Sequence, residues 1–73
     1  MLECSDNQMP ELELSNLPYL TELFCEVNQI SKLDLSNVPS LTTVSCNDNQ
    51  LTGLDLSKVR GLTGLWCYNN YRI

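Results

Sequence analysis

Hydrophobic residues return along this chain in one fixed order. The order is clearest in the segment Leu20-Thr-Glu-Leu-Phe-Cys-Glu-Val-Asn-Gln-Ile30. It returns at 41–51 and 62–72, and a truncated copy stands at 2–9, so that neighbouring copies are 21 residues apart. A fixed period of this size is typical of stacked repeats, in which each repeat covers its neighbour.

Each copy contains two short segments in which apolar and polar residues alternate. Leu2 and Cys4 flank Glu3 in the first segment of the opening copy, and Leu33 and Leu35 flank Asp34 in the second segment of the next. Alternation of this kind predicts short strands or extended pieces. No segment has the spacing of a stable amphipathic helix, and the Asn-Leu-Pro and Asn-Val-Pro sequences that follow the second segment suit tight turns.

One such repeat cannot bury enough apolar surface to offset the entropy lost when it becomes ordered. We therefore predict a repeat solenoid, mainly β, with a parallel sheet of about four short strands. Extended and turn segments form the opposite wall, with little or no helix. Residues 1–73 form one domain: a partial repeat at 1–19, repeats at 20–40 and 41–61, and a partial repeat at 62–73. In the last copy Arg72 replaces the Ile or Leu of the others.

An asparagine follows each predicted strand at the same place in the period. Asn carries one acceptor and two donors, so a column of Asn can satisfy backbone groups that lack partners where the chain turns. This predicts a structural ladder of Asn7, Asn28, Asn49 and Asn70.

Four cysteines share the same spacing. Like side chains stacked at about 4.8 Å do not readily adopt disulfide geometry, and at most two of them can reach one metal ion. We predict a second ladder, of free and largely buried thiols that act as small apolar residues, with no metal site. Its members are Cys4, Cys25, Cys46 and Cys67.

The motif Leu-x-x-Leu-x-Cys-x-x-Asn-Gln-Leu resembles the leucine-rich repeat, with Cys in the place of the third Leu. It is most similar to the short 21-residue class of bacterial cell-surface and secreted proteins. The resemblance implies a right-handed coil whose parallel sheet is the binding wall, and a function in binding other proteins. It also implies a secreted or surface location, although the chain carries no signal peptide. The terminal caps common in the family are absent, which leaves apolar ends and unpaired strand edges.

Composition excludes several classes of function. Nine acidic and four basic residues give a net charge of −5, and the basic residues are dispersed, which disfavours nucleic-acid binding. No apolar run is long enough to insert into a membrane. The chain has no His and no glycine-rich phosphate loop, so we predict no enzymatic activity and no cofactor.

Four columns of the sheet are expected to face solvent. They are Glu22, Thr43 and Gly64; Glu3, Phe24, Ser45 and Trp66; Ser5, Glu26, Asn47 and Tyr68; and Asp6, Val27, Asp48 and Asn69. Because aromatic residues are enriched at binding hot spots, this face is the predicted interaction surface. The candidate binding residues are Phe24, Glu26, Asn47, Asp48, Trp66 and Tyr68.

A second interpretation of the aromatics remains open. Trp66, Tyr68 and Tyr71 could instead cover the C-terminal end or serve self-association into a homo-oligomer. The chain is then a structural, self-assembling or designed repeat fragment that associates through its uncapped ends.

Acidic residues also gather on this face. They favour a basic partner or weak Ca²⁺ binding, and the alternative is a solvated face that keeps the protein soluble. Carboxylates spread over several repeats do not form a compact cage of oxygen ligands. The acidic residues concerned are Glu3, Asp6, Glu22, Glu26 and Asp48.

Overall fold

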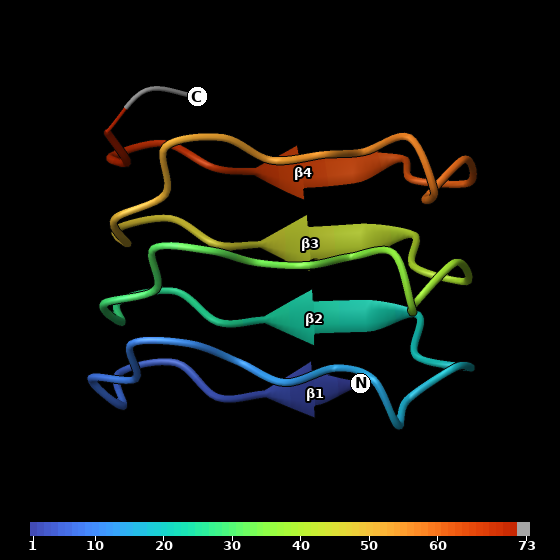
Figure 1. The fold of residues 1–73 in the computed structure, drawn as a ribbon, viewed down its shortest axis with the longest axis horizontal. Coiled ribbons are helices and arrows are strands. Elements are labelled where there is room, and N and C mark those ends of the chain that lie inside the picture. The colour runs from blue at the N-terminus through green and yellow to red at the C-terminus, as the bar shows by residue number, and fades with distance from the viewer. Residues whose placement is uncertain (72–73) are drawn as a thin grey trace.

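The computed structural model describes residues 1–71, and within them the only regular elements are four short strands. They are β1 (Leu2–Glu3), β2 (Glu22–Phe24), β3 (Thr43–Ser45) and β4 (Gly64–Trp66). The strands lie side by side in chain order and all run parallel (Figure 1). The predicted parallel sheet of about four short strands is therefore confirmed.

No helix occurs within the described residues, and so none there could cross a membrane. Arg72, which breaks the apolar pattern of the last copy, lies outside the described residues.

The register of the sheet places equivalent residues of the sequence period opposite one another. Leu23 pairs with Val44, and Val44 pairs with Leu65. Each copy of the 21-residue period, from one strand to the start of the next, is called here a pass of the chain. The pairing continues beyond the strands, because the N–H groups of Cys25 and Cys46 donate to carbonyl oxygens of the next pass at 2.9 and 2.8 Å. Equivalent residues of neighbouring passes therefore lie one strand spacing apart.

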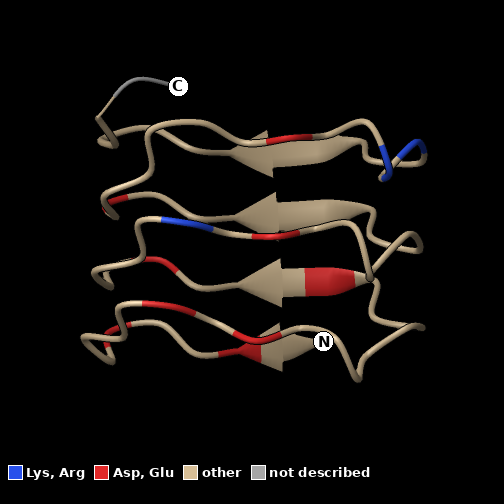
Figure 2. Ribbon diagram, in the orientation of Figure 1, with Lys and Arg blue, Asp and Glu red and all other residues tan. Residues whose placement is uncertain are grey.

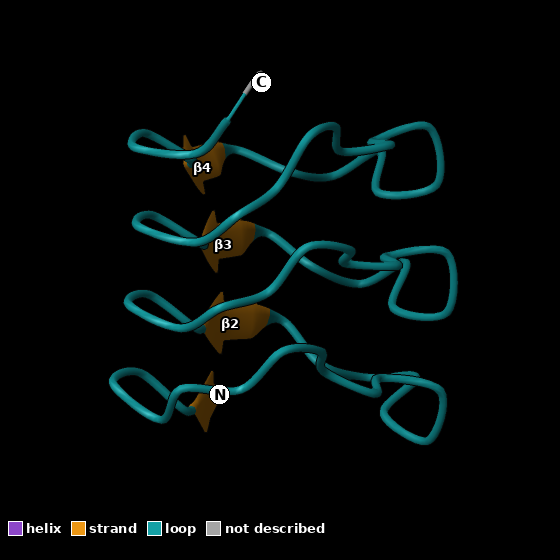
Figure 3. Cartoon of the chain, turned by 60° about the vertical axis from the view of Figure 1, so that its left-hand side comes forward, coloured by secondary structure: helices purple, strands orange, loops and turns teal. Residues whose placement is uncertain are grey.

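The segments that connect the strands pass along the opposite side of the molecule (Figure 3). They form the expected extended pieces. Within residues 1–71 one isolated bridge joins Glu11 to Lys32, and further main-chain hydrogen bonds link neighbouring segments, such as Gln50 N–H to Ile30 O at 2.9 Å. Each segment ends in two successive β-turns. The third connection makes these turns without proline, with Val59 N–H donating to Leu56 O at 3.2 Å.

The core fills the space between the sheet and the connecting segments. The inward residues of β2 and β3, Leu23 and Val44, are completely buried. They meet aliphatic side chains of the opposite wall, of which Leu33 and Leu35 are buried in the second pass. Residues of the first and last passes, such as Leu2 and Leu65, are only partly buried.

All four cysteines are free thiols, as predicted. Cys25 and Cys46 have no exposed surface, whereas Cys4 and Cys67 are half-buried in the first and last passes. The thiols therefore contribute to the core as small apolar side chains.

The side chain of Asn49 ties three parts of the backbone together. Its amide nitrogen lies 3.0 Å from Cys25 O, 3.1 Å from Cys46 O and 3.2 Å from Asn47 O. Its amide oxygen accepts the N–H of Ile30 at 3.1 Å. One buried side chain thus satisfies main-chain groups of its own pass and of the preceding one.

Asn28 and Asn70 repeat this arrangement in the neighbouring passes. Each donates to one cysteine carbonyl of its own pass and one of the preceding pass. Each amide oxygen accepts a main-chain N–H of the preceding pass. Asn7 donates only to carbonyls of its own pass and is exposed. The ladder is therefore directional, since every bridging Asn reaches toward the N-terminal neighbour.

We predict that Asn49→Ala lowers the free energy of unfolding by about 1–3 kcal/mol, because it leaves buried carbonyl and N–H groups without partners. Urea denaturation followed by circular dichroism measures the change.

Asn7→Ala is the matched control, because its amide contacts only its own pass and is open to water. We expect it to cost clearly less than Asn49→Ala. Equal costs for the two variants would contradict a role for the bridge between passes.

Candidate functional site

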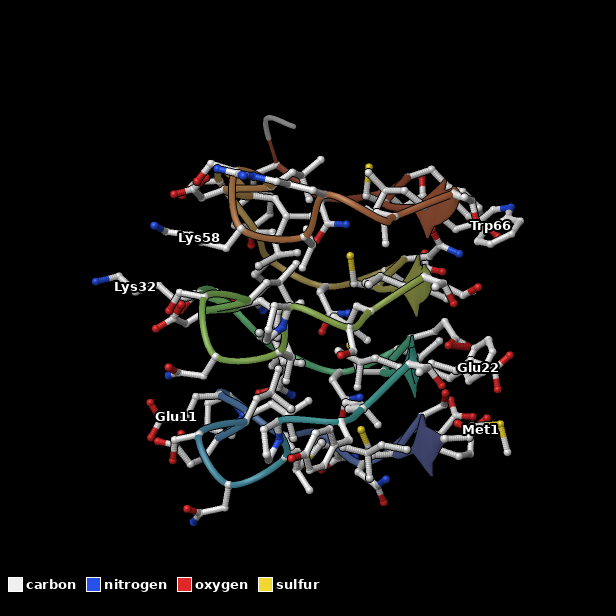
Figure 4. The ribbon with its side chains drawn as sticks, turned by 90° about the vertical axis from the view of Figure 1, so that its right-hand side faces the viewer. Met1, Glu11, Glu22, Lys32, Lys58 and Trp66 are labelled. Carbon is white, nitrogen blue, oxygen red and sulfur yellow. The ribbon has the colours of Figure 1, made fainter. Side chains whose placement is uncertain are left out.

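The side of the sheet that points away from the core is called here the outer face. It consists of the residues that alternate with buried Leu23 and Val44 and of those that continue the alternation beyond each strand. Figure 4 shows Glu22 and Trp66 on this side of the molecule, with Lys32 and Lys58 on the opposite wall. The sequence analysis therefore assigned the inward and outward positions of these strands correctly.

Trp66 is the largest exposed side chain of the outer face, with half of its surface accessible. Its ring lies over Gly64, the residue two positions earlier on the same strand. A Cβ atom at Gly64 would stand 2.9 Å from Cζ3 of the indole, so any larger residue would displace the ring. Gly64 thereby allows the indole to lie along the sheet.

Phe24 and Tyr68 complete the aromatic part of the outer face. Phe24 is partly buried and stands two strands from Trp66 in the register, with Ser45 between them. Tyr68 follows β4 and is 60% exposed. The three predicted aromatic residues thus lie on one side of the sheet.

Ser45 and Asn47 are buried although they face outward, at 8% and 6% exposure. The expectation that they are exposed is wrong. Their small side chains lie between those of the passes on either side, where Phe24 and Trp66 are the neighbours of Ser45 in the register.

Asn47 uses its side chain within the protein. Its amide oxygen accepts the N–H of Tyr68 at 3.0 Å, and its amide nitrogen lies 3.4 Å from Ser45 Oγ. Asn47 therefore supports the backbone of the next pass, and it offers almost no surface to a partner, contrary to its selection as a binding residue.

Glu26 is partly buried on the same face. Its Oε2 lies 3.2 Å from Ser5 Oγ, while its Oε1 is buried and has no hydrogen-bond partner within the described residues. The Ser5 hydroxyl also lies 2.6 Å from Glu3 Oε1. A hydroxyl has one hydrogen, and the shorter contact indicates that Glu3 receives it.

The residues at one equivalent position in the turns that follow the strands have a left-handed backbone conformation. Asp48, at φ 60°, is exposed and accepts a hydrogen bond from the Asn69 side chain at 2.9 Å. Val27 occupies the equivalent place at φ 55° and is 48% exposed. Asp and Asn tolerate this conformation, but a β-branched residue in it is strained.

The opposite wall carries carboxylates of a different kind. Asp34 and Asp55 each accept the N–H of the serine two residues later, at 3.0 and 2.9 Å. These serine hydrogen bonds hold the pKa of both carboxyls below its ordinary value. These are local turn contacts, and they account for Asp34 and Asp55 at these positions without any bound ligand.

The thiols of the core are poor nucleophiles. Burial, as the main cause, raises the pKa of both Cys25 and Cys46 to about 12. Because the thiolate is the reactive form, these residues are inert at neutral pH. Among residues 1–71, no group of three or more Cys, Asp or Glu side chains is arranged to hold a metal ion.

We predict that Val27→Asn raises the free energy of unfolding by about 1 kcal/mol, because Asn adopts the left-handed conformation at lower cost. Thermal or urea denaturation measures the gain. Thr52→Asn is the control, since Thr52 is exposed and has no positive φ. A Val27→Asn variant no more stable than the parent would show that the backbone there is not strained.

The buried thiols predict how stability depends on pH. Their folded pKa of about 12 lies above the ordinary value of 9.0, so folding favours the protonated form. The stabilisation is complete below pH 9.0 and is lost progressively as the pH rises from there toward about 12.

Urea midpoints measured across this range test the prediction. The parent is expected to lose stability more steeply with pH than a Cys25→Ala, Cys46→Ala double variant. Identical slopes for the two proteins would contradict it.

Comparison with protein-family models, with curated proteins and with solved structures found no match to this chain. Function is therefore inferred from the outer face and from the resemblance that the sequence motif carries. The predicted binding residues that remain available are Phe24, Glu26, Trp66 and Tyr68 on that face and Asp48 in the turn beside it.

Proposed function

We propose that this protein is a non-catalytic protein-binding module of the leucine-rich-repeat solenoid type, and that it binds through the outer face. The observation that carries the proposal is the presence of three aromatic side chains on one side of the sheet, two of them at least half exposed. Exposed Trp and Tyr are the residue types most enriched among interface hot spots.

The way in which Trp66 is held supports this role. Gly64 leaves room for the indole, and the Asn side chains fix the backbone that follows each strand. A rigid backbone lowers the entropy lost on binding, so an aromatic residue on it serves better as an anchor than one on a flexible loop.

The framework also separates stability from recognition. The ladder bonds run between Asn side chains and the main chain, and the core uses inward side chains only. Outward positions such as 24, 66 and 68 can therefore carry any side chain at small cost to the fold. Large aromatic residues at such positions favour a role outside the core.

A displayed peptide library selected on the parent protein tests the proposal. We expect peptides selected on the parent to bind Trp66→Ser about tenfold more weakly or worse, because loss of a hot-spot aromatic costs over 1 kcal/mol. Tyr19→Ser is the matched control, since Tyr19 is 87% exposed but lies outside the outer face. Its variant is expected to bind as the parent does.

Two outcomes would contradict the proposal. Peptides that lose as much affinity with Tyr19→Ser as with Trp66→Ser do not recognise the outer face. The other outcome comes from sedimentation of the parent over a wide range of concentration. If the mass rises with concentration, and Trp66→Ser returns it to the monomer value, the aromatic residues serve self-association. That second function is favoured by the partly exposed core residues of the first and last passes.

A further inference from the structure

Charge is divided unequally between the two walls of the molecule. The outer face carries Glu3, Glu22 and Glu26 and, within residues 1–71, no Lys or Arg, while Asp6 and Asp48 lie in the turns beside it. Lys32 and Lys58 project from the opposite wall, and the basic segments in Figure 2 lie away from the strands. A partner of the outer face therefore meets negative charge that the protein itself does not neutralise.

Glu26 is the acid of this face that most needs a partner. Its Oε1 is buried without a hydrogen bond, and the single hydrogen of Ser5 is drawn to Glu3. A buried carboxylate oxygen without a donor is costly, and the cost is recovered when the carboxylate turns outward to meet a charged donor. Neither Asp34 nor Asp55 on the opposite wall has this property, because serine groups satisfy them.

Aromatic surface stands close to this carboxylate. Phe24 precedes Glu26 by two residues on the same side of the chain, which places their backbones about 7 Å apart. Trp66 lies two strands from Phe24, about 10 Å away, with buried Ser45 between them. Carboxylate and aromatic faces thus lie within the reach of one long side chain.

These observations select arginine over lysine. The guanidinium group is planar, stacks on aromatic faces and donates several hydrogen bonds in a fixed fork. It is also less strongly hydrated than an ammonium group, so that it enters a partly buried site more readily. Lys supplies the charge but neither the stacking nor the fork.

We propose that the outer face binds an arginine-bearing polypeptide segment, with one guanidinium hydrogen-bonded to the Glu26 carboxylate and stacked against Phe24 or Trp66. This rests on the proposed function and specifies the partner. Asp48, exposed beyond β3, provides further attraction for a second basic residue of the segment.

An acetylated nonapeptide of alternating serine and arginine is the probe, and its serine–lysine counterpart is the control. Amide NMR titration of the parent at physiological salt is expected to shift the signals of residues near 24–26 and 66–68 together with the Trp66 indole N–H. We expect the arginine peptide to bind about tenfold more tightly than the lysine peptide, the size of one charge-assisted hydrogen bond.

Variants of matched charge locate the interaction. Glu26→Gln is expected to weaken binding of the arginine peptide about tenfold, whereas Glu11→Gln, which removes the same charge from the opposite wall, changes it less than about twofold. Phe24→Leu keeps the apolar volume but removes the aromatic face, and it should narrow the difference between the two peptides. Circular dichroism of each variant confirms that it is folded.

Equal affinity for the two peptides, or equal loss with Glu26→Gln and Glu11→Gln, would overturn the proposal and assign the binding to diffuse attraction by the net charge. These outcomes can be distinguished from failure of the proposed function. Library peptides that need Trp66 but contain no arginine would leave the outer face as a binding surface and remove only its preference for arginine.

Discussion

The structure depends on the hydrogen bonds that each asparagine side chain makes to the main chain of two neighbouring passes. At Asn49 one amide reaches carbonyls from both passes and accepts an N–H of the earlier one. Strands of two or three residues supply few ladder bonds of their own. The side-chain bonds extend that pairing through the turn, where the main chain would otherwise leave polar groups buried without partners.

Because these bonds go to the backbone, they fix position without specifying the side chains outside. The inward column is restricted to Leu, Val and Cys by the space available, and burial makes Cys25 and Cys46 behave as apolar residues. The outward columns vary more, although Asn47 in one of them also accepts a main-chain N–H of the next pass. They hold residues as different as Glu22, Thr43 and Gly64 at one equivalent place. Outward side chains can therefore vary on a constant backbone frame.

Much of this arrangement was predictable, because residues one sequence period apart become partners on neighbouring strands of the sheet. The four strands, the free thiols and the Asn positions all follow from one spacing. What could not be predicted depends on the size of neighbours across strands. Ser45 and Asn47 alternate correctly toward solvent, yet larger residues on both sides bury them. Gly64 gave a usable signal, since a glycine two residues before Trp66 leaves room for the ring.

Two residues of the second pass conflict with the local rules that the others obey. Val27 holds a left-handed backbone where the equivalent places have Asp or Asn, and Glu26 leaves a buried oxygen without a donor. Both costs are local and could be removed by residues that the chain uses one pass away. Sites where a local choice opposes the fold are where function is expected. Both conflicts lie within three residues of Phe24, so the proposed binding surface extends from Trp66 to the end of β2.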